Sequence, residues 1–134
     1  RDFLKAGLIS HPNDPQLLNN LSYSYALDNM TKEALELLDK ISHDSSIEIT
    51  TKICLTATRG LVYFRSGFSD LGRKLYLEAI QDAKDINNEY YNWLAILNYV
   101  REEILIKSES MNSMMDIVAL IPDKTEYIYS KIKK

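Results

Sequence analysis

The residues most able to do chemistry in this chain are two histidines and one cysteine. His11 and His43 each lie in a predicted turn, and no cysteine or carboxylate stands near them at the spacing of metal ligands. Cys54 has no histidine close in sequence that could activate its thiolate. The histidines are therefore interpreted as solvated turn residues and Cys54 as a structural thiol.

A run of charge, Arg101-Glu102-Glu103, falls inside a predicted helix and is interpreted as a solvated face with local ion pairs. No second acidic cluster is spaced to converge with it. The chain also has no phosphate-binding loop, nucleophile elbow or zinc motif. We therefore expect no catalytic, cofactor or metal site, and we expect that the protein is not an enzyme.

Composition limits the possible partners. Apolar residues make up 46% and charged residues 26%, which suits a packed globular core, and three prolines and four glycines favour long helices. A net charge of -3 disfavours a nucleic-acid partner, and no apolar run is long enough to span a membrane. The single cysteine excludes an intrachain disulfide and fits a cytoplasmic location. Because the first residue is Arg, we expect a piece of a larger protein.

Apolar residues at helical spacing, separated by turn residues, predict a series of paired helices. Asn29 and Gly67 supply breaks inside the first two pairs, because both residue types adopt the left-handed conformation that ends a helix. Thr31 is expected to cap the helix that follows the first break. The predicted helices are 16–27, 32–41, 47–66, 69–84, 89–107, 111–121 and 123–134.

The first two pairs share a residue pattern. The first pair has Leu18-x2-Leu21-Ser22-x2-Tyr25 and then Ala34-x3-Leu38, and the second has Gly60-x2-Tyr63 and then Gly72-x3-Tyr76-x2-Ala79. Eight residues separate the tyrosine from the small residue in both pairs. This pattern resembles the tetratricopeptide repeat. In the third pair only Tyr91-x2-Leu94-Ala95 fits, with Asn98 in place of the tyrosine.

Two features depart from that pattern. Thr56 and Arg59 occupy positions that are normally apolar, and Ser22 is 38 residues from Gly60 where the repeat has 34. Pentatricopeptide and Sel1-like repeats have similar lengths and remain alternatives. Gly72 in mid-helix, which costs about 1 kcal/mol relative to Ala, predicts a very close approach to the preceding helix.

The resemblance implies an all-α fold, a right-handed superhelix of about two and a half to three repeats with an extra C-terminal helix. The whole chain, 1–134, would be one domain. Its parts would be the second helix of a truncated repeat (1–11), repeats at 15–41 and 47–84, a degenerate repeat at 88–121, and a C-terminal helix at 123–134.

The resemblance also implies a concave groove lined by the first helix of each pair. The expected lining residues are Asn19, Tyr23, Leu27, Leu61, Phe64, Arg65, Ile96 and Tyr99. With few charges, this surface suits a peptide or helix of a partner protein, and Arg65 could pair with a partner carboxylate. A chaperone C-terminal peptide is disfavoured, because Ala57 and Thr58 stand where its carboxylate would need polar ligands.

The expected function is a non-catalytic scaffold for protein–protein interaction. The alternative is an accessory or regulatory domain that docks within a larger multidomain enzyme or regulator. A third hypothesis is a homo-oligomer through the N-terminal apolar face, because Phe3, Leu4 and Leu8 lack their expected partner helix.

Overall fold

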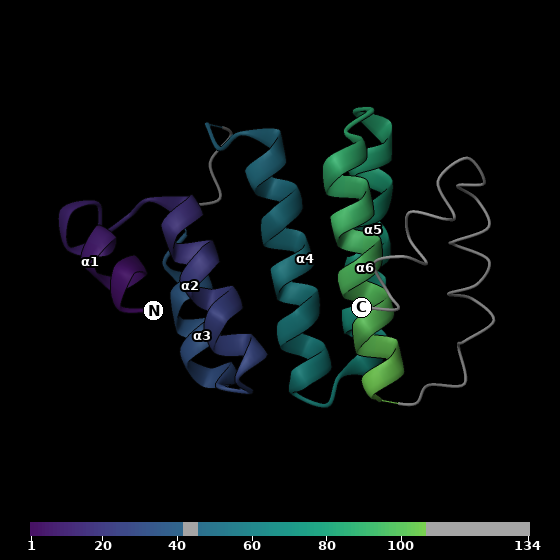
Figure 1. The fold of residues 1–134 in the computed structure, drawn as a ribbon, viewed down its shortest axis with the longest axis horizontal. Helices are drawn as coiled ribbons and strands as arrows, with labels where there is room; N and C mark the ends of the chain where they lie inside the picture. Colours follow the sequence, from purple (N-terminus) through teal and green to yellow (C-terminus); the bar gives the residue numbers. More distant parts are fainter. Residues whose placement is uncertain (42–45, 107–134) are drawn as a thin grey trace. The chain divides into compact units, whose positions relative to one another are not determined.

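The computed structural model describes residues 1–41 and 46–106, and this part of the chain contains six α-helices and no β-strand (Figure 1). The helices are α1 (Asp2–Ser10), α2 (Pro15–Leu27), α3 (Thr31–Asp39), α4 (Ile49–Arg65), α5 (Ser69–Asp85) and α6 (Glu89–Leu105). The all-α prediction is therefore confirmed for these residues. The helices expected at 111–121 and 123–134 lie outside the described residues.

The chain divides into two compact units, Arg1–Ala79 and Ile80–Lys134, and the boundary falls inside α5. In the first unit α2 packs against α1, α3 and α4, and α3 packs against α4 (Figure 1). In the second unit α6 meets the last turns of α5, where the Asn92 side-chain amide donates a hydrogen bond to the Ile80 carbonyl oxygen at 2.9 Å.

Helix ends follow the local sequence closely. Asp14 caps α2 by accepting hydrogen bonds from the backbone N–H groups of Gln16 and Leu17, and Pro15 fills the first helical position. Asn29 has a φ of 62° and Gly67 a φ of 89°, so both predicted left-handed breaks are confirmed. The capping role predicted for Thr31 is wrong, because Thr31 is already the first residue of α3.

A third break between helices precedes α6. Asn87 has a φ of 56°, and the Asn88 side chain accepts a hydrogen bond from the Tyr91 backbone N–H at 3.0 Å. Asn88 therefore caps α6 just as Asp14 caps α2. This capped start agrees with the predicted beginning of the third helix pair near Asn88.

Small residues mark the points where paired helices touch. The Ser22 hydroxyl donates to the Ala34 carbonyl oxygen at 2.9 Å, which joins α2 to α3. A Cβ atom placed on Gly72 of α5 would lie 2.7 Å from the Gly60 carbonyl oxygen of α4. The close approach predicted from Gly72 is therefore confirmed.

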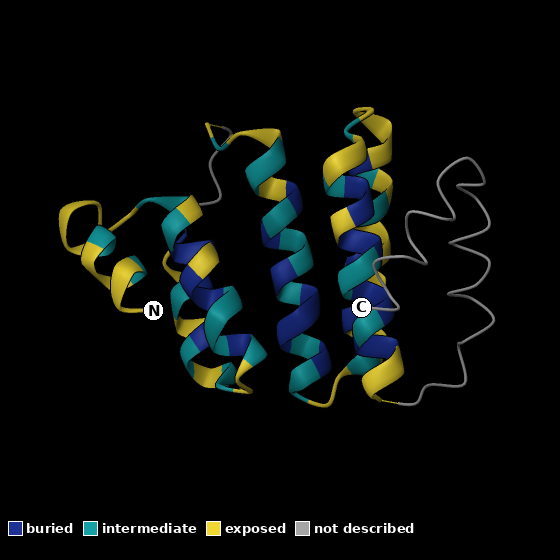
Figure 2. Ribbon diagram, in the orientation of Figure 1, coloured by how far each residue is buried: buried dark blue, intermediate teal, exposed yellow. Residues whose placement is uncertain are grey.

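The buried core contains aromatic side chains that the repeat pattern did not assign to it. Tyr76 is 1% exposed, as expected for a core tyrosine, and Phe64 and Tyr99 are also buried, at 4% and 0% exposure. Figure 2 shows buried residues along α2, α4 and α6. By contrast, Tyr25 and Tyr63, which stand at the pattern's core positions, are half-buried.

Candidate functional site

Those residues singled out for their chemistry that the structure describes do not assemble into a reactive centre. His11 is exposed at the end of α1, and His43 lies outside the described residues. Among residues 1–41 and 46–106, no group of three His, Cys, Asp or Glu side chains is placed to hold a metal ion. No helix in this part of the chain is long and apolar enough to cross a membrane.

Cys54 lies half-buried on α4. Burial raises the pKa of its thiol above the ordinary value, because a thiolate loses solvation in an apolar environment. A raised pKa keeps the sulfur protonated at neutral pH and therefore unreactive. This environment agrees with the interpretation of Cys54 as a structural thiol.

The two glutamates of the charge run on α6 are buried, so the prediction that they form a solvated face is wrong. Glu102 is 1% exposed and Glu103 is 0% exposed. Arg101 Nε forms an ion pair with Glu102 Oε2 at 2.8 Å, and the Tyr99 hydroxyl donates a hydrogen bond to Glu103 Oε2 at 2.8 Å. Buried carboxylates are tolerated when they are paired and hydrogen-bonded in this way. The local ion pairing predicted for this run is confirmed by the Arg101–Glu102 contact.

Five of the eight predicted groove residues are buried in the described part of the chain, and a role for the eight in partner binding stays a prediction. The buried residues are Asn19, Leu61, Phe64, Ile96 and Tyr99. Leu61, Ile96 and Tyr99 are fully enclosed at 0% exposure. Only Tyr23, Leu27 and Arg65 keep partial exposure. The open part of the predicted groove is therefore confined to α2 and the last turn of α4.

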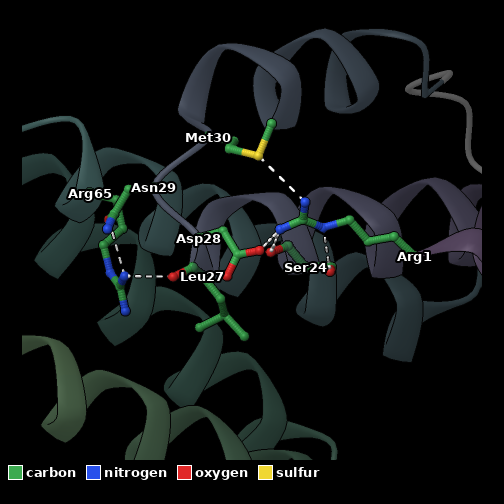
Figure 3. Close-up of polar contacts among 7 residues, drawn as sticks. All are labelled: Arg1, Ser24, Leu27, Asp28, Asn29, Met30 and Arg65. Atoms are coloured by element: carbon green, nitrogen blue, oxygen red, sulfur yellow. Dashed lines mark hydrogen bonds and ion pairs between the residues drawn. The ribbon is translucent and has the colours of Figure 1, made fainter.

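Arg65 forms hydrogen bonds within the protein itself, although we predicted that it could pair with a carboxylate of a partner. Its Nη1 donates to the Leu27 carbonyl oxygen at 3.0 Å and to Asn29 Oδ1 at 3.1 Å (Figure 3). A cation at the C-terminus of α2 also suits the helix dipole. Arg65 thus caps α2 from α4 and fixes the turn that leads into α3.

Arg1 approaches the same turn from the opposite side in Figure 3. It forms an ion pair with Asp28, and its Nε donates to the Ser24 hydroxyl at 3.2 Å. Its guanidinium carbon also lies 4.6 Å from the centre of the Tyr25 ring. The turn between α2 and α3 is therefore fixed by arginines from both neighbouring segments.

The surface that stays open on α2 is a row of four side chains at helical spacing: Gln16, Asn20, Tyr23 and Leu27. We call this row the α2 face. Gln16 and Asn20 are exposed, Tyr23 and Leu27 are half-buried, and α2 carries no charged residue. Beside this row lies Asn19, whose Oδ1 is buried and receives no hydrogen bond from any described residue.

A second open row lies on α4 and was not predicted as a surface. It consists of Lys52, Thr56, Arg59 and Tyr63, and we call it the α4 stripe. The signal was present in the sequence, because Thr56 and Arg59 are the two residues that depart from the apolar repeat pattern. Polar residues at those positions mark the side of α4 that is not fully covered.

The N-terminal apolar face remains partly open. Phe3 and Ile9 are 88% and 84% exposed, whereas Leu4 and Leu8 are half-buried. The proximity of Gly7 to the Leu17 side chain shows that α1 uses its other side to pack on α2.

Comparison with models of known protein families, with curated proteins and with solved structures finds no match.

Proposed function

We propose that this chain is a non-catalytic protein-interaction module built from tetratricopeptide-type helix pairs in a right-handed superhelix. Two observations support the repeat assignment. The Ser22–Ala34 hydrogen bond and the Gly60–Gly72 approach both join the helices of a pair at the small residues of the repeat pattern. The left-handed residues Asn29 and Gly67 separate the helices of those two pairs.

Asn19 carries the binding part of the proposal. Leaving a buried amide oxygen without a partner costs about 1–3 kcal/mol, and such groups are rare in folded proteins. Asn19 Oδ1 is such an atom, and it lies one helical turn before Tyr23. Because this oxygen is buried, the Asn19 side chain would rotate outward to accept a hydrogen bond from a backbone N–H of a bound protein segment, while Tyr23 and Leu27 supply apolar contact area.

The α2 face suits an uncharged stretch of another protein. It contains two carboxamides, one tyrosine and one leucine, and no ionisable carboxylate or amine. Carboxamides can both donate hydrogen bonds to a peptide backbone and accept them from it. These side chains can therefore bind the main chain of a ligand that carries no charge.

Comparative affinity capture tests the proposal. The wild-type chain, Tyr23→Ala and Asn19→Leu are immobilised, and bound proteins are quantified by mass spectrometry. Tyr90→Ala is the matched control, because Tyr90 is 67% exposed on α6 and its loss also removes one surface aromatic ring. We expect the same proteins to be lost from both α2 variants and retained by the control.

Identical capture by all four proteins, with thermal melting showing that each is folded, would rule out the α2 face as the binding surface. Cross-linking of Gln16 or Asn20 variants to another segment of a longer parent protein would instead favour an accessory domain that docks within its own chain.

A further inference from the structure

The open side of α4 carries positive charge that no residue of the described ranges neutralises. Lys52 is exposed and Arg59 half-exposed, and among the described residues no acidic side chain pairs with either. Helices α2 and α4 contain no aspartate or glutamate, and Glu48, the exposed N-cap residue of α4 four residues before Lys52, forms no ion pair with it. Although α3 packs against α4 and carries three carboxylates, none of them reaches these two cations. The α4 stripe is therefore complementary to an acidic ligand.

Apolar side chains lie at the far end of the same stripe. The Tyr63 ring meets the Phe68 ring edge-to-face with centroids 6.4 Å apart, and Phe68 is 58% exposed. Leu71, one turn into α5, is 49% exposed. The Phe68 backbone N–H donates to the Tyr63 carbonyl oxygen at 2.9 Å, so the turn that carries Phe68 is fixed to α4 before any ligand arrives.

The spacing of these groups sets the form of the ligand. A rise of about 1.5 Å per residue places Lys52 and Arg59 about 10 Å apart along α4, and Tyr63 about 6 Å further on. An extended polyproline-II segment has three residues per turn and a rise of about 3.1 Å per residue, so every third side chain lies on one face at intervals of about 9 Å. A docking helix would need a continuous apolar row, which the alternation of cations with Thr56 does not provide.

We propose that the α4 stripe binds an extended acidic segment of another protein. Two carboxylates three residues apart pair with Lys52 and Arg59, and an apolar side chain three residues beyond the second carboxylate, on the same face of the segment, packs against Tyr63 and Phe68. Thr56 needs no hydrogen-bond acceptor from the ligand, because its hydroxyl already donates to the Lys52 carbonyl oxygen at 3.0 Å. This site uses a different helix from the α2 face and does not depend on the function proposed above.

A synthetic peptide serves as the probe. It carries two glutamates three positions apart and a leucine three positions beyond the second, in a background of serine and glycine, with a fluorescent label. Binding to the full chain is followed by fluorescence anisotropy. Replacing both glutamates by glutamine should weaken binding by about tenfold or more, and added salt should weaken the glutamate peptide alone.

Charge reversal on the protein locates the site. Arg59→Glu and Lys52→Glu should each weaken the glutamate peptide by about tenfold. Lys32→Glu is the matched control, because Lys32 is an exposed lysine on α3, and it should change binding by less than about twofold. Phe68→Ser should weaken the leucine peptide but not a version with serine in place of leucine.

Three outcomes would overturn the proposal. They are no saturable binding of the glutamate peptide, an equal loss in the Lys32→Glu control, and tighter binding of a single-stranded oligonucleotide than of the peptide. The last result would assign the stripe to nucleic acid instead. Tyr23→Ala should leave peptide binding unchanged, so this test and the capture test on the α2 face fail independently.

Discussion

The carbonyl oxygen of Gly60 lies 2.7 Å from the position that a Cβ atom would take at Gly72. The same Cβ would lie 2.6 Å from Cδ2 of the Phe64 ring. No side chain fits between α4 and α5 at this point, since one of the two obstacles is backbone and the other is a buried ring. The backbones of the two helices are therefore in contact at these two glycines.

Gly72→Ala should destabilise the chain by about 2 kcal/mol, because the added methyl group forces α4 and α5 apart. At an exposed helical glycine the same substitution would instead stabilise the protein, since Ala has the higher helix propensity. Gly7→Ala is the matched control, because its Cβ would meet only the flexible end of Leu17 at 3.3 Å. Urea unfolding of both variants measures the difference. A Gly72→Ala variant as stable as Gly7→Ala would contradict the close approach.

Local features of the fold were predictable because they depend on single residue types. Asn29 and Gly67 were recognised as left-handed breaks, and Gly72 as a contact point, since few other residues tolerate those backbone positions. Only the precise helix ends differed, as for Thr31. Such differences are expected where several residues near a helix end can serve as the cap.

The choice of exposed face was less predictable. On α4 the buried residues include both Ile53 and Leu55, which point in different directions around the helix. A helix covered from several sides has apolar residues on most of its circumference, so periodicity does not indicate which narrow side stays open. This is why Leu61 and Phe64 were assigned to a groove, while Arg59 was treated as a departure from the pattern.

Arg65→Ala should destabilise the chain by about 1–2 kcal/mol, because the variant loses the charged donor that bonds the end of α2. A double-mutant cycle with Asn29→Gly isolates the second hydrogen bond, since glycine keeps the left-handed turn and removes the acceptor oxygen. We expect a coupling free energy of about 0.5 kcal/mol or more from chemical denaturation. Strict additivity of the two substitutions would mean that the Arg65–Asn29 bond contributes nothing.

Cys54 in the folded chain should react with iodoacetamide more slowly at pH 8 than the same cysteine in guanidinium chloride. Burial raises the pKa of the thiol, so the reactive thiolate is scarce, and the folded-state rate should keep rising with pH beyond the ordinary value of 9.0, where the unfolded rate levels off. Because the raised pKa favours the protonated folded state, its contribution to stability is complete below the unfolded pKa and is lost as the pH rises. Alkylation followed by intact-mass measurement tests this. A folded-state rate equal to the unfolded rate would contradict it.

Asn19→Leu should stabilise the isolated chain by about 1 kcal/mol, because leucine removes a buried oxygen that no described residue satisfies. Asn92→Leu is the matched control. Asn92 is also a buried helical asparagine, but its amide donates to the Ile80 carbonyl oxygen at 2.9 Å, so the same change should be destabilising. Thermal unfolding of both variants measures the two changes in stability, an expected increase for Asn19→Leu and an expected decrease for Asn92→Leu.

The Asn19 result also bears on function. A variant that is more stable yet captures fewer proteins would show that this asparagine costs stability and serves binding, which is the behaviour expected of a site residue. A loss of stability in Asn19→Leu comparable to that in Asn92→Leu would show instead that the Asn19 amide is satisfied within the fold. The oxygen would then need no donor from a bound segment, and the observation that supports binding at the α2 face would be lost.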